Sequence, residues 1–274
     1  MAMNLATKYS DKVSERFVNK SLTDSGLNKE YDWSGVKTVT VYSIDTVPLN
    51  SYTRNGSNRY GTANDLGNTK QEMTLSEDKA FTFVIDKGNM TESVGTLEAG
   101  KCLAREIDEV IVPEIDKHRL TKWGEVAQTT GTAEAITKEN AYAKLLIAQE
   151  KLDEAEIPST GRILYCTPAF YSAIKLDPSF MLASDIGMEK RINGQVGEID
   201  GVKVVKVPST RMPENTAFIL IHPSCSCSPL KLEDYKTHIN PPGISGWLVE
   251  GRIIFDCFVL ESRKKGVVCH KVSE

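Results

Sequence analysis

The sequence predicts an α+β fold, and three features indicate it. Apolar residues alternate with polar ones in VKTVTVYSI (residues 36–44) and in AFTFVI (residues 80–85), which is typical of strands. Between residues 91 and 128, apolar residues instead recur at steps of three and four, which is typical of a helix. The two patterns follow one another without the regularity of βαβ units, so we expect α+β rather than α/β architecture.

The composition is that of an ordinary globular protein and excludes several classes. The 274 residues are 40% hydrophobic and 26% charged, with a net charge of −4, enough chain for one large domain or two small ones. No basic bias indicates a nucleic-acid groove. The start of the chain lacks the apolar run of a secretory signal, and no apolar stretch is long enough for a membrane span. We expect the six cysteines to be free thiols in a reducing cytoplasm.

Residues 1–36 are expected to form an N-terminal arm. Leu5, Tyr9, Val13 and Phe17 recur at roughly helical spacing, which predicts a short amphipathic helix. Such a helix has no core of its own, so it must lie on another element or another subunit. Tyr9 and Phe17 are its candidate contact residues.

Residues 37–90 are expected to form a long two-stranded hairpin, with strands near 36–44 and 80–85. The polar, glycine-containing stretch 53–70 between them is too long for a plain turn. A two-stranded hairpin is only marginally stable alone in water, so a projecting one implies a neighbour.

The tip of this hairpin carries Tyr52, Arg54, Arg59 and Tyr60. We interpret them as contacts between subunits, because Tyr and Arg anchor protein interfaces. The alternative is a nucleic-acid contact with aromatic side chains interleaved between bases, which the acidic neighbours Asp65 and Glu72 weaken. A solvated loop is the simplest interpretation.

Residues 91–128 are predicted to be the longest helix, a spine for the fold. Its apolar stripe is expected to consist of Val94, Leu97, Ala104, Ile107, Val110 and Ile111. Pro113 should either kink this helix or begin a second one in its first turn. Leu97, Ile107 and Ile111 are the candidate core residues.

The second half of the chain mixes helices and strands. We expect a helix from Thr137 to Pro158, a buried strand at 162–168, and a helix that begins at Pro168, is capped by Thr167 and turns Phe170, Ile174 and Leu176 inward. Further elements are expected as follows: a turn at Asp200-Gly201, a strand at 217–223, a Pro/Gly-rich, irregular connection at 224–246, and strands near 247–261 and 266–272 that turn at RKKG.

One cluster of metal-binding residue types raises the possibility of a zinc enzyme. His222, Cys225 and Cys227 form H-x-x-C-x-C, and Cys269-His270 follows near the C-terminus. The spacing departs from the paired cysteines of structural zinc sites, so buried thiols are the simpler interpretation. The chain has no G-x-S-x-G, phosphate-binding loop or H-E-x-x-H. We therefore expect no catalytic site, no metal and no cofactor.

Several stretches make the chain resemble the major capsid protein of tailed bacteriophages, of the HK-ninety-seven-type fold. The resemblance covers nearly the whole chain. It is carried by YDWSGVKTVTVYSIDTVPLNSYTRNGSNRYGT, EIDEVIVPEID, VGEIDGVKVVKVPSTRMP followed by AFILIHPS, and IIFDCFVLESRKKGV.

The resemblance implies a domain order. It implies an N-arm (1–36), an E-loop hairpin (37–90), a spine helix with the P-domain (91–160), mainly A-domain (161–240) and returning P-domain strands (241–274). Some members of the family cross-link through lysine and asparagine side chains, for which Lys70, Lys79 and Lys87 are candidates.

The resemblance also implies a function: a structural protein that self-assembles through pentamers and hexamers into an icosahedral shell around double-stranded DNA. The subunit would be assembled in the bacterial host cytoplasm and end in the virion. Its partners would be other copies of itself, a scaffolding protein, a portal, decoration proteins and, non-specifically, packaged DNA, without a membrane. An encapsulin-type nanocompartment shell, which houses cargo enzymes, is the close alternative.

Overall fold

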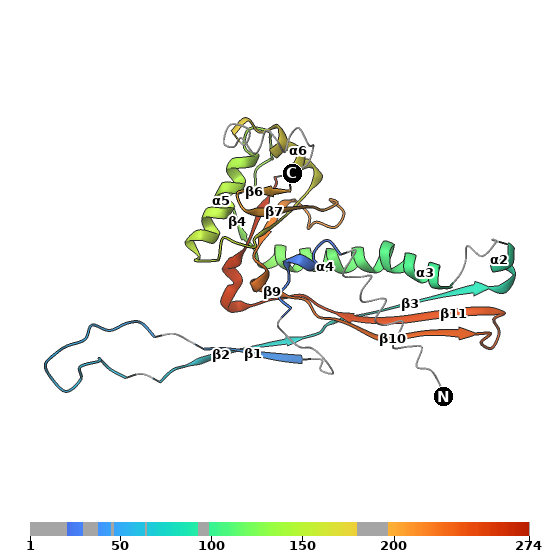
Figure 1. The fold of residues 1–274 in the computed structure, drawn as a ribbon, viewed down its shortest axis with the longest axis horizontal. Coiled ribbons are helices and arrows are strands. Elements are labelled where there is room, and N and C mark those ends of the chain that lie inside the picture. The colour runs from blue at the N-terminus through green and yellow to red at the C-terminus, as the bar shows by residue number, and fades with distance from the viewer. Residues whose placement is uncertain are drawn as a thin grey trace. The chain divides into compact units, whose positions relative to one another are not determined.

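A computed structural model describes residues 21–29, 38–44, 47–63, 65–92, 99–179 and 197–273 (Figure 1). The chain divides into two compact units. Residues 32–75 form one, which we call the hairpin unit, and residues 1–31 with 76–274 form the other, which we call the body. Tyr9, Phe17, Val94 and Leu97 lie outside the described residues, so their expected roles stay predictions.

The hairpin unit contains two antiparallel strands, β1 (Thr38–Ile44) and β2 (Asn68–Thr74). The expected return strand is therefore wrong, because the segment 80–85 belongs to β3 (Glu77–Asp86) and pairs within the body. The sequence of β2, NTKQEMT, lacks apolar alternation. A ribbon of two strands encloses no core of its own, and in β2 only Met73 is an apolar residue that is buried, so the alternation by which strands are recognised is weak.

The body contains an elongated antiparallel sheet in the order β10 (Leu230–Ile239), β11 (Gly246–Phe255) and β3. Strand β10 lies in the stretch expected to be an irregular connection, so that expectation is wrong. A register shift between Leu232 and Asp234 interrupts the strand, and its sequence LKLEDYKTHI mixes charged and apolar residues. Both features hide the period-two signal.

A helix runs along one face of this sheet. After the short α2 (Lys87–Glu92), it comprises α3 (Ala99–Glu106), a π-turn (Ile107–Ile111) and α4 (Val112–Val126). Pro113 lies in the first turn of α4, one of the two alternatives predicted, yet the backbone stays helical at Ile111 and Val112. The Val112 N–H bonds to the Ile107 carbonyl, five residues back, so the widened turn accommodates the proline ring.

The π-turn also explains an error in the predicted stripe. Ile107 is buried against the elongated sheet and Ile111 packs on its margin, but Val110 is 51% exposed. The buried stripe steps from Ile107 to Val112 because the π-turn inserts one extra residue. A strict 3.6-residue period cannot anticipate that shift.

The body also holds a six-stranded sheet. Its order is β4 (Gln128–Thr129), β13 (Val267–Lys271), β8 (Thr216–Ile221), β5 (Ile163–Cys166), β7 (Val202–Lys206) and β6 (Glu198–Ile199). The expected strands at 162–168 and 217–223 are confirmed as β5 and β8. The expected strands near 247–261 and 266–272 correspond to β11 and β13, and the 3-10 segment η4 (Glu261–Gly266), which contains RKKG, connects the elongated sheet to this one.

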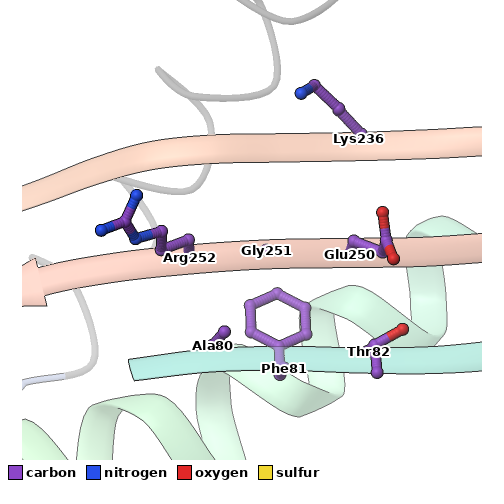
Figure 2. A pocket seen from close by; sticks show the side chains of 7 residues that line it. All are labelled: Ala80, Phe81, Thr82, Lys236, Glu250, Gly251 and Arg252. Carbon is purple, nitrogen blue, oxygen red and sulfur yellow. The ribbon is translucent and has the colours of Figure 1, made fainter. Parts of the chain in front are cut away.

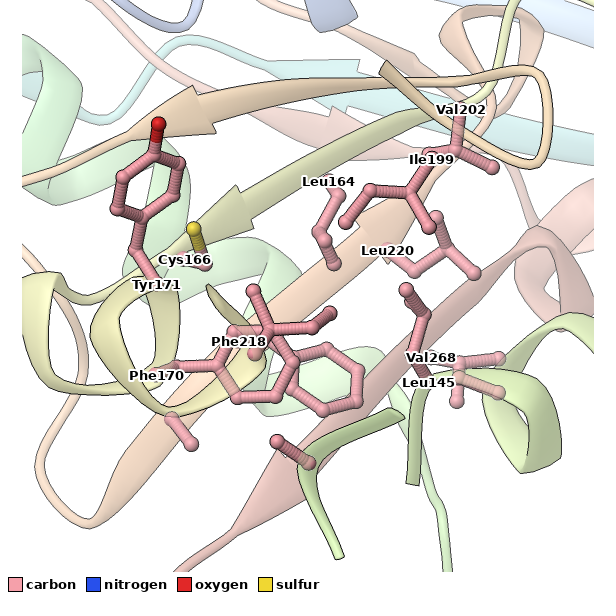
Figure 3. Close-up of a cluster of buried hydrophobic side chains, with 14 of the residues drawn as sticks. Leu145, Leu164, Cys166, Phe170, Tyr171, Ile199, Val202, Phe218, Leu220 and Val268 are labelled. Atoms are coloured by element: carbon pink, nitrogen blue, oxygen red, sulfur yellow. The ribbon is translucent and has the colours of Figure 1, made fainter. Parts of the chain in front are cut away.

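Both faces of the six-stranded sheet are buried. Helices α5 (Ala141–Glu154) and α6 (Pro168–Leu176) cover one face, where Phe170 packs on Phe218 (Figure 3). Leu120 and Trp123 of α4 cover the other. Alternate residues of each strand therefore serve opposite cores.

The cap of α6 is confirmed, since the Thr167 hydroxyl accepts from the Phe170 N–H at 3.3 Å. Leu176, expected to point inward, is instead 64% exposed. It is the last residue of the helix.

Candidate functional site

Exposed apolar side chains gather on the hairpin unit. Six large hydrophobic residues of the unit are more than half exposed: Tyr42, Val47, Leu49, Tyr52, Tyr60 and Leu66. Leu49 is fully exposed and Tyr60 is 83% exposed. Large apolar side chains in water make this unit a candidate interaction surface.

Contacts between residues of the hairpin tip fix the conformation of the tip. The Tyr52 and Tyr60 rings meet edge to face with centroids 5.1 Å apart. The Thr53 N–H donates to the Arg59 carbonyl at 3.0 Å, and Arg59 Nε donates to the Gly56 carbonyl at 3.1 Å. The structure thus brings Tyr52, Arg59 and Tyr60 together, and Arg54 lies exposed in the same loop.

A second feature, which sequence reasoning missed, fixes residues 21–29 to the body. The carboxylate of Asp116 on α4 is fully buried. It accepts from the Ser21 and Thr23 hydroxyls, each at 2.6 Å, and from the Leu22 N–H at 3.1 Å. Arg211 Nη1 completes the set at 3.1 Å. A buried carboxylate is destabilising unless it is hydrogen-bonded in this way.

Arg119 lies one turn further along α4 and is 1% exposed. It donates to the hydroxyls of Ser21, Thr23 and Ser228 at 3.2, 3.1 and 2.9 Å. Burial lowers the pKa of its guanidinium, against the opposing charge of Asp116. We call Ser21, Thr23, Asp116 and Arg119 the latch. The sequence does contain a sign of the latch: Asp116 and Arg119 are three residues apart and fall on the same face of the helix as its buried apolar residues.

The packing beneath residues 21–29 is close. The Trp123 and Tyr165 rings lie 5.3 Å apart, and a Cβ on Gly26 would stand 2.6 Å from the Tyr165 hydroxyl. Only glycine fits there. The Asn28 N–H also bonds to the Ser226 carbonyl at 2.7 Å. Residues 21–29 are thus part of the folded body.

A second polar cluster joins Ser76, which directly precedes β3, to α4. Asp256 accepts from Ser76 Oγ at 2.7 Å, from His118 Nε2 at 3.0 Å and from the Cys257 N–H at 2.8 Å. Burial pushes the pKa of this carboxyl upward, but these hydrogen bonds outweigh burial and hold it at about 2. The charged carboxylate therefore stabilises the fold at neutral pH.

The residues considered for zinc have other roles. His222 Nδ1 accepts from the Ser224 N–H at 3.3 Å. His270 is buried, accepts from Thr130 Oγ1 at 2.6 Å and donates through Nε2 to the Glu134 carbonyl at 2.9 Å. Burial raises the pKa of the Cys227 and Cys257 thiols to about 12. Cys225 and Cys269 are also buried, and in the described part of the chain no three His, Cys, Asp or Glu side chains are grouped to hold a metal.

The three lysines considered for cross-linking differ in setting. Lys70 on β2 pairs with Glu72, and Lys87 donates its N–H to the Ser245 carbonyl at the start of α2. Lys79 lies on β3 in the body and pairs with Glu114 of α4 at 2.5 Å. Only Lys70 therefore lies on the hairpin unit.

A shallow hollow of about 330 Å³ lies on the elongated sheet (Figure 2). Phe81 stands beside Gly251, where a Cβ would come within 2.4 Å of the ring, so the glycine makes room for the aromatic side chain. Lys236, Glu250 and Arg252 line the rest. Within the described ranges no helix is both long and apolar enough to cross a membrane.

No protein-family model matches the chain, and neither does any curated protein. Solved structures do match over most of the chain. One from Mycobacterium phage Che8 is 16% identical with a TM-score of 0.70, over 92% of this chain and 90% of that one. The capsid of Cyanophage P-SCSP1u is 12% identical with a TM-score of 0.65, over 88% and 85%. A virus-like particle from Pyrococcus furiosus is 11% identical with a TM-score of 0.56, over 98% and 100%.

Proposed function

We propose that this chain, which has the fold of tailed-phage major capsid proteins, is itself the shell-forming subunit of a tailed phage. The expected fold is confirmed by the similarity to phage capsid structures over about nine tenths of the chain, as with Mycobacterium phage Che8 at a TM-score of 0.70. That similarity is the observation that carries the proposal. Identity at this level establishes a fold, and function rests on the features that follow.

The distribution of apolar surface supports assembly. The six-stranded sheet and its helices bury their apolar residues within one chain. The hairpin unit instead leaves Leu49, Tyr52 and Tyr60 in water. A two-stranded ribbon with exposed aromatic side chains gains stability when a neighbouring subunit covers it.

By this proposal Tyr52, Arg54, Arg59 and Tyr60 contact a neighbouring subunit, and Tyr9 and Phe17 contribute a second contact from the N-terminal arm. The subunits form pentamers and hexamers, closed into an icosahedral shell. Scaffolding, portal and decoration proteins complete the particle. The net charge of −4 suits a shell that packaged DNA must slide past, because like charge discourages tight binding.

A nanocompartment shell is the second candidate. The match to the virus-like particle from Pyrococcus furiosus covers 98% of this chain and 100% of that one. A shell of that kind encloses protein cargo, so the two candidates differ in what they contain rather than in the subunit contacts.

Electron microscopy of the purified protein, alone and co-expressed with the products of neighbouring genes, tests the proposal. We expect closed shells of one diameter class. A monodisperse small species under both conditions would refute shell formation. Nuclease-protected double-stranded DNA in particles from infected or induced cells supports the phage capsid, whereas an enclosed enzyme supports the nanocompartment.

A further inference from the structure

A small apolar cavity opens beside the π-turn. Its volume is about 140 Å³, and its apolar lining comprises Ala80, Phe81, Val110, Ile111, Ile115, Ile253 and Phe255. Val110 stands at its rim, 51% exposed. A cavity of roughly 150 Å³ lined by such side chains takes up benzene, so this one suits a single aromatic ring.

The mouth of the cavity is acidic. Glu106 and the Lys79–Glu114 ion pair line it. Two carboxylates and one basic side chain therefore line the opening.

The hairpin tip has the complementary chemistry. Tyr60 presents an aromatic ring that is 83% exposed, and Tyr52 supports it edge to face. Arg54 and Arg59 lie in the same loop, and Asp65 is the only acidic residue in the sequence from 47 to 67. Tyrosine enters a pocket with its apolar body and keeps its hydroxyl at the wet mouth.

We propose that Tyr60 of one copy docks into the cavity beside the π-turn of a second copy, with Arg54 and Arg59 facing the carboxylates at its mouth. The proposal deepens the shell function and rests on it. Charge complementarity and the match of ring to cavity select another copy of this chain as the occupant.

The π-turn is an independent argument. Such turns occur frequently at functional sites. Here the extra residue carries Val110 out of the buried stripe to the rim of the cavity.

Charge reversal tests the electrostatic part. We expect Arg54→Glu with Arg59→Glu to lower shell yield at least about tenfold, and Glu106→Arg with Glu114→Arg to do the same. Combining the four changes should restore much of the yield. The matched control, Glu150→Arg with Glu154→Arg on exposed positions of α5, should leave the yield unchanged. Full yield from either reversed pair would overturn the proposal.

Cross-linking tests the contact directly. In a Cys102→Ser background, subunits with Tyr60→Cys are co-expressed with subunits carrying Val110→Cys, and the particles are treated with a short bismaleimide. We expect a covalent dimer on a denaturing gel, absent when either variant is expressed alone. Shells that form without this dimer would overturn the docking alone. If the unaltered protein forms no shells, the proposed function itself has failed.

Discussion

Strands β5 and β1 contain similar residues but differ in how far those residues are buried. Every residue of β5 is buried, with Ile163 and Tyr165 on one face and Leu164 and Cys166 on the other. Strand β1 has one partner strand, and Tyr42 at its exposed surface is 62% accessible. The buried apolar residues therefore determine whether the subunit folds, whereas the exposed ones of the hairpin unit are candidates for contacts between subunits.

The largest expected effect comes from placing a charge in the body. Ile107→Asp puts a carboxylate without a partner against the elongated sheet, which should cost about 4 kcal/mol or more. We therefore expect no soluble subunit. Val110→Asp, three residues away but exposed, should remain folded. Soluble yield and circular dichroism compare the two, and a folded Ile107→Asp subunit would contradict the assigned face.

The second-largest loss of stability is expected when the latch is disrupted. Asp116→Ala leaves Arg119 buried without its nearby carboxylate and frees the hydroxyls of Ser21 and Thr23, so we expect a loss of about 3–5 kcal/mol. Glu109→Ala removes an exposed carboxylate on the same helix and should cost less than about 1 kcal/mol. Urea unfolding measures both. Equal losses would show that the latch contributes no more than a surface ion pair.

Asp256 should make stability fall in acid. Its pKa of about 2 lies below that of the unfolded chain, so the stabilisation is complete above the unfolded pKa of about 4 and disappears as the pH falls toward 2. The shift corresponds to about 2 kcal/mol. Unfolding free energies between pH 5 and pH 2 should fall less steeply for Asp256→Asn than for the unaltered protein. Parallel curves would assign the acid sensitivity to other carboxylates.

The smallest effect on stability is expected in the hairpin unit. Removing residues 54–66 deletes exposed side chains that contribute to no buried cluster of the body. The free energy of unfolding should change by less than about 0.5 kcal/mol, while shell formation is lost. Sedimentation and electron microscopy measure assembly. Normal particles would refute the role of the tip, and an unfolded subunit would refute the division into two regions.

Some elements of this fold can be predicted from the sequence and others cannot. Local chemistry specifies β5, β8, the Thr167 cap and the turn at Asp200-Gly201, where both φ angles are positive. Those elements are correct because each is determined by its own residues and a two-sided core.

The predictions from sequence fail where residues distant along the chain determine the local structure. Strands β2 and β10 carry weak alternation and are specified by the strands beside them. The latch unites residues almost a hundred positions apart, and no local pattern pairs Ser21 with Asp116. The residues assigned to subunit contacts, Tyr52, Arg54, Arg59 and Tyr60, remain predictions about a neighbour.

The π-turn has a consequence for how the length of this helix can vary. Deleting Glu109 would place Ile107 four residues before Val112, so a regular helix would keep both on the buried stripe. A deletion after Ile115 would instead rotate Leu120 and Trp123 by about 100° away from their core. Without the widened turn, however, the ring of Pro113 meets the preceding carbonyl, at about 3 kcal/mol. The insertion and the proline are thus a compensating pair, and the shorter helix is expected to be tolerated when Pro113→Ala accompanies it.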